Sequence, residues 1–122
     1  MGERYLTILE VSQKQAYIFA SNKLRDNIVN SAVIAWVMSN DYFKETIGDA
    51  NLYCEEENYV YSGGGHTILE FASKEKADEF VKKITSTIRK EYPGIEVFAK
   101  TLEYRTSLEA GANIKELTQQ LE

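Results

Sequence analysis

A run of three glycines followed by the only histidine of the chain is the segment best suited to contact a ligand. It stands between two short runs of β-branched and aromatic residues, 59–61 and 67–71, and this pattern is typical of a β-hairpin. A two-residue turn needs at most two residues with positive φ, so the third glycine favours close approach by a phosphate or by another backbone. A flexible turn without a ligand is the competing interpretation. The segment consists of Gly63, Gly64, Gly65 and His66.

Four charged or titratable side chains have both a functional and a plain structural interpretation. His66 is either an exposed turn residue or a donor to a nucleotide phosphate or base, and a general base is a further role open to histidine. Glu10 follows an apolar run and has the position of a polar residue at a strand end. Arg25 and the neighbouring Lys23 are either solvated charges at the start of a helix or groups that face phosphates.

The length and composition of the chain are those of one small domain. The chain has 122 residues, of which 43% are hydrophobic and 27% charged, enough for a core without disulfides or metals. Its net charge of −5 argues against a strongly basic nucleic-acid surface. The single cysteine, Cys54, excludes an internal disulfide and fits a reducing compartment. No apolar run approaches the roughly 20 residues of a membrane span, and the first residues lack the layout of a signal peptide. We therefore expect a cytoplasmic protein.

The first half of the chain predicts a central strand and a long helix. Residues 5–11 are rich in β-branched and aromatic types, and both alternate positions are largely apolar, as in a strand that is covered on both faces. Residues 12–23 are expected to form one or two helical turns. From residue 24 to about residue 47 apolar side chains recur with helical spacing, which predicts one helix. Gly48 has the position of its C-terminal cap.

The second half predicts a hairpin, a helix and a strand. Residues 52–54 are expected to form a short edge strand, and the glutamates at 55–57 form either a solvated loop or, if a turn brings them together, a cation site. After the hairpin, residues 73–92 carry one apolar stripe and end at Tyr-Pro-Gly, which predicts a helix. Residues 95–104 alternate as a half-exposed strand does. A short closing helix is expected at 113–121.

This order of elements predicts an α+β fold. A strand, a helix, a two-stranded hairpin, a second helix and a last strand give the βαββαβ, ferredoxin-like topology. It has a four-stranded antiparallel sheet with two helices on one face. We expect the domain to span residues 1–104 and a C-terminal extension with the short helix to span residues 105–122. The sequence ends partway through that expected helix, which suggests a piece cut from a longer protein.

Several short motifs resemble those of a known family. In their order along the chain they are similar to the palm domains of the large, polymerase-like subunit of type III CRISPR effector complexes, which are themselves similar to nucleotidyl cyclases. The resemblance covers roughly residues 4–103 and implies a palm of ferredoxin-like fold. The matching segments are Gln-Ala-Tyr-Ile-Phe at 15–19, Leu-Arg at 24–25, Ser-Ala at 31–32 and Tyr-Ser-Gly-Gly-Gly-His at 61–66.

The hairpin departs from that of an active palm. Active palms carry two acidic residues after a Gly-Gly pair, and with a first-strand carboxylate these hold two cations. Here Gly65 and His66 stand at the acidic positions, and Glu10 falls at or near the first-strand position. The resemblance therefore implies a degenerate palm that binds ATP or a related nucleotide, with Glu10 as the candidate ligand for Mg²⁺ or Mn²⁺. The candidate nucleotide-binding residues are Gly63, Gly64, Gly65, His66, Glu10 and Arg25.

The resemblance also implies partners. These are a second palm domain, a second copy of the chain or other CRISPR effector subunits of an antiviral system, with nucleic acid contacted only inside such a complex. Two other functions stay open. A divergent metal-dependent nucleotidyl cyclase, or cyclic oligonucleotide synthase, would use Glu10 together with carboxylates from a partner. A dimerisation module without a ligand would use the same fold, which serves many unrelated tasks.

Overall fold

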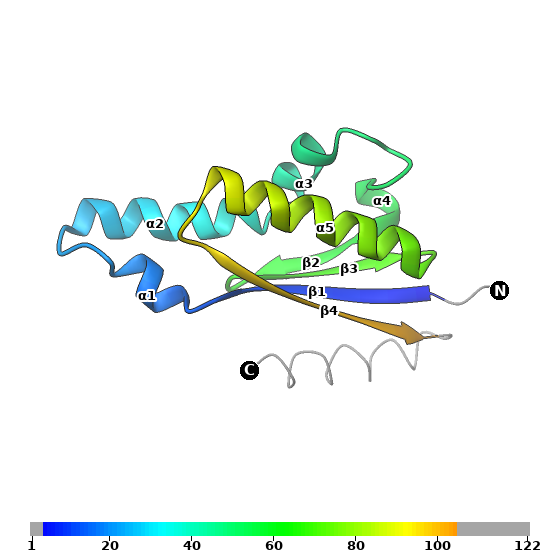
Figure 1. The fold of residues 1–122 in the computed structure, drawn as a ribbon, viewed down its shortest axis with the longest axis horizontal. Coiled ribbons are helices and arrows are strands. Elements are labelled where there is room, and N and C mark those ends of the chain that lie inside the picture. The colour runs from blue at the N-terminus through cyan, green and yellow to red at the C-terminus, as the bar shows by residue number, and fades with distance from the viewer. Residues whose placement is uncertain (1–3, 105–122) are drawn as a thin grey trace.

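The computed structural model describes residues 4–104, and Figure 1 shows their arrangement. Three helices, α2, α3 and α5, lie along one side of a four-stranded sheet. In chain order the elements are β1 (Arg4–Ser12), α1 (Lys14–Ile18), α2 (Leu24–Val37), α3 (Asn40–Ile47), α4 (Glu55–Asn58), β2 (Tyr59–Gly63), β3 (His66–Phe71), α5 (Lys74–Glu91) and β4 (Glu96–Tyr104).

The sheet has the topology that the sequence predicts. Its strands stand in the order β2-β3-β1-β4, and all neighbouring pairs are antiparallel. β1 is a central strand, hydrogen-bonded to β3 on one side and to β4 on the other. The expected α+β, ferredoxin-like fold is thus confirmed, and the hairpin turn between β2 and β3 lies beside the end of β1.

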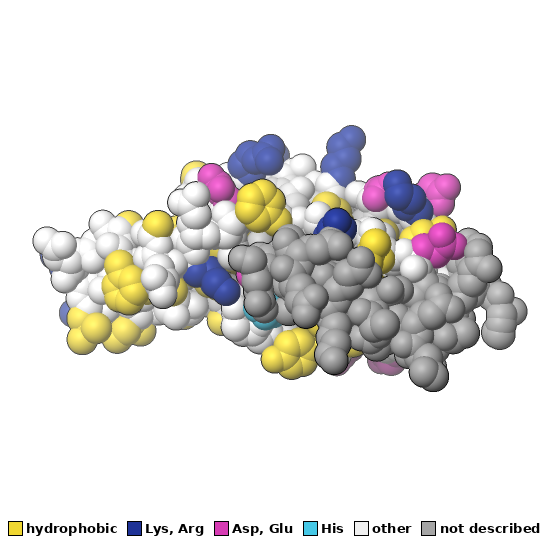
Figure 2. Space-filling model, turned by 90° about the horizontal axis from the view of Figure 1, so that it is seen from below, with side chains coloured by type: hydrophobic (Ala, Val, Ile, Leu, Met, Phe, Trp, Pro, Cys, Tyr) yellow, Lys and Arg dark blue, Asp and Glu magenta, His cyan; other side chains and the backbone are white. Residues whose placement is uncertain are grey.

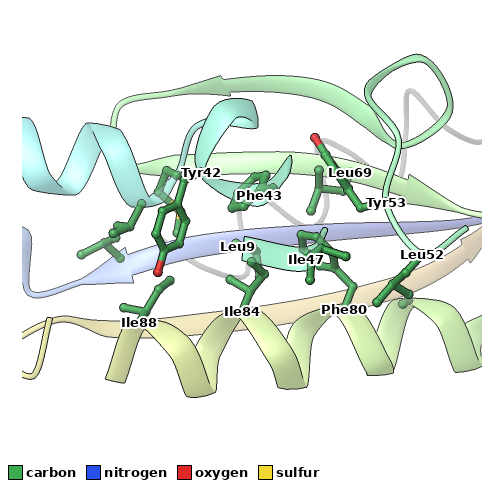
Figure 3. Packing of buried hydrophobic residues seen from close by; sticks show 14 of the residues in the cluster. Leu9, Tyr42, Phe43, Ile47, Leu52, Tyr53, Leu69, Phe80, Ile84 and Ile88 are labelled. Atoms are coloured by element: carbon green, nitrogen blue, oxygen red, sulfur yellow. The ribbon is translucent and has the colours of Figure 1, made fainter. Parts of the chain in front are cut away.

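The main hydrophobic core fills the space between the sheet and the helices (Figure 3). Leu9 and Leu69 project into it from the sheet, and α3 and α5 supply aromatic and branched side chains from the other side. Burial of each such side chain stabilises the fold by about 1.5–3 kcal/mol. The labelled residues from the helices and from the loop after α3 are Tyr42, Phe43, Ile47, Leu52, Tyr53, Phe80, Ile84 and Ile88.

The other side of the sheet also carries buried apolar residues. Because successive strand residues point to opposite faces, Leu6 and Ile8 of β1 and their neighbour Ile68 of β3 face away from the helices, and all three are buried. Figure 2 views the molecule from this side. The prediction that the first strand is covered on both faces is therefore confirmed.

The predicted single helix over residues 24–47 was wrong, because the chain breaks at Ser39 into α2 and α3. Ser39 is extended, with φ −95° and ψ 154°. Its hydroxyl donates to the carbonyl of Trp36 (2.7 Å) and accepts from the backbone N–H of Tyr42 (3.2 Å), so one side chain satisfies both helix ends. The apolar period does not reveal the break, since both helices bury side chains in the same core. Gly48, with φ 63°, ends α3 as predicted.

The segment between α3 and β2 also differs from the prediction. Residues 52–54 form turn and loop rather than an edge strand, and residues 55–57 belong to the short helix α4. The side chain of Asn58 holds this segment, because its Oδ1 accepts from the backbone N–H of Cys54 (2.8 Å) and its Nδ2 donates to the carbonyl of Glu70 (2.7 Å). These two side-chain hydrogen bonds hold the segment in place of the backbone hydrogen bonds that an added edge strand would make.

The remaining predictions for this part of the chain hold. The helix expected at 73–92 is α5, capped by the Ser73 hydroxyl, which accepts from the N–H of Lys76 (3.2 Å), and the last strand is β4. The closing helix expected at 113–121 lies outside the described residues. Within residues 4–104 no helix combines the length and the hydropathy needed to cross a membrane.

Candidate ligand site at the glycine hairpin

The hairpin turn is made by two of the three glycines. Gly64 and Gly65 connect β2 to β3 with φ values of +61° and +83°, the combination that a tight two-residue hairpin turn requires. Gly63 belongs to β2 and has no positive φ. A Cβ at Gly63 would lie 2.6 Å from the hydroxyl oxygen of Tyr61. Because this hydroxyl is the far end of an exposed side chain that can move away, the contact does not by itself require a glycine.

The turn is fixed to the end of β1. Glu10 and His66 stand directly opposite each other in the β1–β3 register, and His66 Nδ1 lies 3.7 Å from Glu10 Oε2. The backbone N–H of Val11 donates to the carbonyl of Gly65 (2.9 Å). Glu10 and His66 lie on the sheet face that points away from the helices, whereas the glycine turn extends beyond the sheet toward α2.

Lys14 links the glycine turn to Glu10. The sequence analysis did not single out this lysine. Its Nζ donates to the carbonyl of Gly64 (2.7 Å) and lies 4.0 Å from Glu10 Oε2. A left-handed residue, Gln13 (φ 52°), turns the chain from β1 into α1 and so directs Lys14 back over the turn. Among residues 4–104, Gln13 is the one non-glycine residue with positive φ, a conformation that costs about 1–2 kcal/mol.

The glycine turn forms one wall of a cavity of about 420 Å³. α1 and α2 form the opposite wall, with apolar side chains and one serine, and among residues 4–104 Lys14 is the only charged residue that lines the cavity. The cavity therefore combines a cation and exposed backbone groups at one end with apolar surface at the other. The lining residues are Lys14, Ile18, Ser31, Ile34, Ala35, Met38, Ser62, Gly63, Gly64 and Gly65.

The candidate residues from the sequence are only partly brought together. The three glycines line the cavity, while Glu10 and His66 lie beside the turn and do not line it. Arg25 is exposed in the first turn of α2. It stands ten residues before Ala35, about 15 Å along the helix, and does not line the cavity.

The residues at the turn do not fit a site for two cations. Glu10 is the one carboxylate there, and the ammonium of Lys14 and the ring of His66 are its neighbours. Within the described part of the chain no three His, Cys, Asp or Glu side chains gather as a metal-binding group. Two-cation chemistry needs several carboxylates around the metals, and the described residues at the turn do not supply them.

The acidic segment and the cysteine lie elsewhere. Directly before α4 the thiol of Cys54 donates to Glu56 Oε1 (3.1 Å), and this hydrogen bond holds the pKa of Glu56 below its usual value. Glu55 lies 3.7 Å from the ammonium of Lys44. Exposed charges paired in this way are typical of a solvated surface.

Comparison with known proteins identifies solved structures of the same fold. A Csm1–Csm4 cassette in complex with cA3 superposes with a TM-score of 0.60 at 14% identity, covering 82% of this chain and 14% of that chain. The apo Csm1–Csm4 cassette gives a TM-score of 0.59 at 15% identity, covering 86% of this chain and 15% of that chain. Csm1 in T. onnurineus gives a TM-score of 0.54 at 14% identity, covering 85% of this chain and 15% of that chain. No protein-family model matches the chain, and none of the curated proteins is similar to it in sequence.

These likenesses concern the fold. Over more than four fifths of its length the chain has the fold of a segment of Csm1, the type III CRISPR protein that carries a palm. The chain spans about one seventh of the length of those proteins. The fold implied by the sequence motifs is therefore the fold observed.

Proposed function

We propose that the chain is a degenerate palm domain of the type III CRISPR kind, which binds an ATP-like nucleotide in the cavity beside the glycine turn. It does not catalyse by itself; it works by pairing with a catalytic palm or with a second copy of itself, inside a CRISPR effector assembly in the cytoplasm. The observation that carries this proposal is the cavity that joins the glycine turn, Lys14 and α2.

The chemistry of the cavity suits a nucleotide. A Lys ammonium and the open backbone of glycines are groups that bind phosphate. The hydroxyls of Ser31 and Ser62 add polar partners, and Ile18, Ile34 and Met38 offer apolar surface for a sugar and base. A volume of about 420 Å³ is within the usual range of about 300–1,000 Å³ for small-molecule sites.

The similar structures support the same ligand class. Among them are Csm1–Csm4 cassettes in complex with one ATP, with AMPPNP and with cyclic oligoadenylates. Those ligands belong to those proteins, and we carry the nucleotide to this chain as part of the proposal. The Csm1–Csm4 pairing supports, in the same way, association with other effector subunits.

Calorimetry with ATP tests the proposal directly. Ala35 is an exposed helix residue that lines the cavity, whereas Ala32 is exposed on the same helix and does not line it. Leucine is nearly as good a helix former as alanine, so Ala35→Leu fills the cavity at little cost to α2. We expect saturable ATP binding by the wild type and by Ala32→Leu, and its loss in Ala35→Leu. Equal binding by both variants would place the nucleotide elsewhere.

Two further results separate the other functions. Product formed from ATP only with Mg²⁺ or Mn²⁺, and lost in Glu10→Gln, would favour the divergent cyclase or cyclic oligonucleotide synthase. A stable dimer with no nucleotide binding would favour the dimerisation module. The degenerate palm predicts binding that Glu10→Gln retains and no product with either metal.

A further inference from the structure

A second cavity lies where the ends of α2 and α5 meet α3. Its volume is about 470 Å³, and it shares no residue with the cavity beside the glycine turn. Three aromatic rings, two carboxylates and two threonines line it. The lining residues are Trp36, Tyr42, Glu45, Thr46, Thr87, Glu91 and Tyr92.

The three rings form one connected group. Trp36 and Tyr42 pack edge to face with their centroids 5.5 Å apart, and the centroids of Tyr42 and Tyr92 are 6.4 Å apart. Tyr42 is buried, while Trp36 and Tyr92 are half-buried and line the cavity. An aromatic ring attracts a cation that lies over its face within about 6 Å of the ring centroid, and three such rings line this cavity.

The charges of the cavity are of one sign. Glu45 and Glu91 line it, and no Lys or Arg of the described residues does. Glu91 Oε1 accepts a hydrogen bond from the hydroxyl of Tyr42 (2.9 Å), which fixes the carboxylate at the cavity wall. In the described range 4–104 no basic side chain lies within 4.0 Å of the carboxylate oxygens of either glutamate.

We propose that this cavity binds the guanidinium group of an arginine side chain supplied by a partner protein. A guanidinium is planar, stacks on aromatic rings and donates to carboxylates through a fork of N–H groups, and the cavity offers both kinds of contact. An ammonium group is also attracted to aromatic rings, but it lacks the planar fork of N–H groups that can stack on a ring and donate to two carboxylates at once. The proposal concerns a surface distinct from the nucleotide cavity, so either can fail without the other.

The fluorescence of Trp36 reports on this cavity, because it is the only tryptophan in the chain. We would titrate the full chain with N-acetyl-arginine methylamide, with its neutral citrulline analogue and with free arginine. The expected result is a saturable change with the capped arginine and none with citrulline. Free arginine should also bind, because it has the same guanidinium and the charges of its α-ammonium and α-carboxylate cancel.

Matched variants locate the response. Glu91→Gln and Glu45→Gln should each weaken capped-arginine binding about tenfold; Glu91→Gln keeps an acceptor for the hydroxyl of Tyr42. Glu79→Gln, an exposed glutamate on α5 that does not line the cavity, should bind as the wild type does. An equal response to citrulline, no saturable response, or equal affinity in Glu91→Gln, Glu45→Gln and Glu79→Gln would overturn the proposal.

Discussion

At the scale of single residues, Lys14 connects the glycine turn with the end of β1. Its ammonium reaches the carbonyl of Gly64 and the carboxylate of Glu10, and its aliphatic part packs where a Cβ at Gly65 would lie. A bound phosphate would offer this ammonium a stronger acceptor than a neutral carbonyl. Lys14 is therefore the charged group on which nucleotide binding depends most in the proposed site.

We predict that Lys14→Met weakens ATP binding about tenfold, or about 1.4 kcal/mol, with little change in stability. Methionine keeps the unbranched stem over Gly65 but removes the charge, and half-exposed ion pairs contribute no more than about 1 kcal/mol. Calorimetry gives the affinity and urea denaturation the free energy of unfolding. Lys82→Met, on the exposed surface of α5, is the control. Unchanged ATP affinity in Lys14→Met would contradict the assigned role.

A second prediction concerns the backbone of the turn. Gly64 has φ +61°, which alanine adopts at a cost of about 1–2 kcal/mol and asparagine much more readily. Gly64→Ala should therefore lower the free energy of unfolding by about that amount, and Gly64→Asn by less than half as much. Urea denaturation of both variants measures the difference. Equal stabilities would mean that the turn adopts another conformation.

The residue scale also shows what the sequence can reveal about the site. The glycine run with its histidine is visible as a pattern, and so is Glu10 at a strand end. Lys14 carries no such signal, since a lysine after a strand is usually solvated. Its position depends on the left-handed turn at Gln13, which no local pattern predicts for glutamine. Arg25 matched a motif, yet the helix that carries it places it away from the cavity.

At the scale of elements, the helix side of the sheet is held partly by buried tyrosines. Tyr42 donates to Glu91 on α5, and Tyr53 donates to Asn40 Oδ1 (2.6 Å) at the start of α3. Burial raises the pKa of both hydroxyls well above 10, with neighbouring carboxylates, Glu91 and Glu55, adding to the effect. Both groups are therefore neutral donors at ordinary pH.

This arrangement predicts a loss of stability in alkali. Below pH 10 both tyrosines are protonated in the folded and the unfolded chain, so their contribution is constant. Above pH 10 the unfolded chain releases these protons first, so the free energy of unfolding falls by up to about 1.4 kcal/mol per pH unit for each tyrosine. Urea denaturation between pH 9 and 11 measures the slope. Tyr42→Phe and Tyr53→Phe should each reduce it; a slope unchanged in both variants would contradict the account.

Elements were predicted well where one signal dominated. The glycine run predicted the hairpin, and an apolar stripe that ends at Pro-Gly predicted α5. Alternating side-chain polarity predicted β4. The break between α2 and α3 was missed, because Ser39 is compatible with a helix interior and its double hydrogen bond forms only once both helices are placed. Residues 52–54 look strand-like because Leu52 and Tyr53 are buried, but side-chain bonds of Asn58 hold them in a loop.

At the scale of the whole molecule, an apolar patch lies at the end where α1 finishes and α2 begins. Figure 2 shows hydrophobic side chains at this end of the molecule. Leu24 and Ile28 are 73% and 61% exposed, and Phe19 and Val29 are also exposed. Contiguous exposed apolar surface of this kind marks interaction sites, and we assign this apolar patch to the proposed pairing with another palm.

The isolated chain has no second palm, so we predict that it pairs with itself through the apolar patch. Sedimentation velocity should show a concentration-dependent dimer of the wild type, and the double variant Leu24→Glu/Ile28→Glu should stay a monomer. Val60→Glu, at an exposed position of β2, should dimerise like the wild type. A wild type that is monomeric at every concentration, or a double variant that still dimerises, would contradict this assignment.

The central claim, a nucleotide bound at the glycine turn, is tested most directly by nuclear magnetic resonance of the ¹⁵N-labelled chain. The glycine amides serve as built-in probes: Gly63, Gly64 and Gly65 line the proposed cavity, whereas Gly48 ends α3 and Gly94 follows α5. On titration with ATP, the account predicts saturable shifts of the three hairpin amides and no shift of Gly48 or Gly94. Hairpin amides that stay unchanged at millimolar ATP would contradict it.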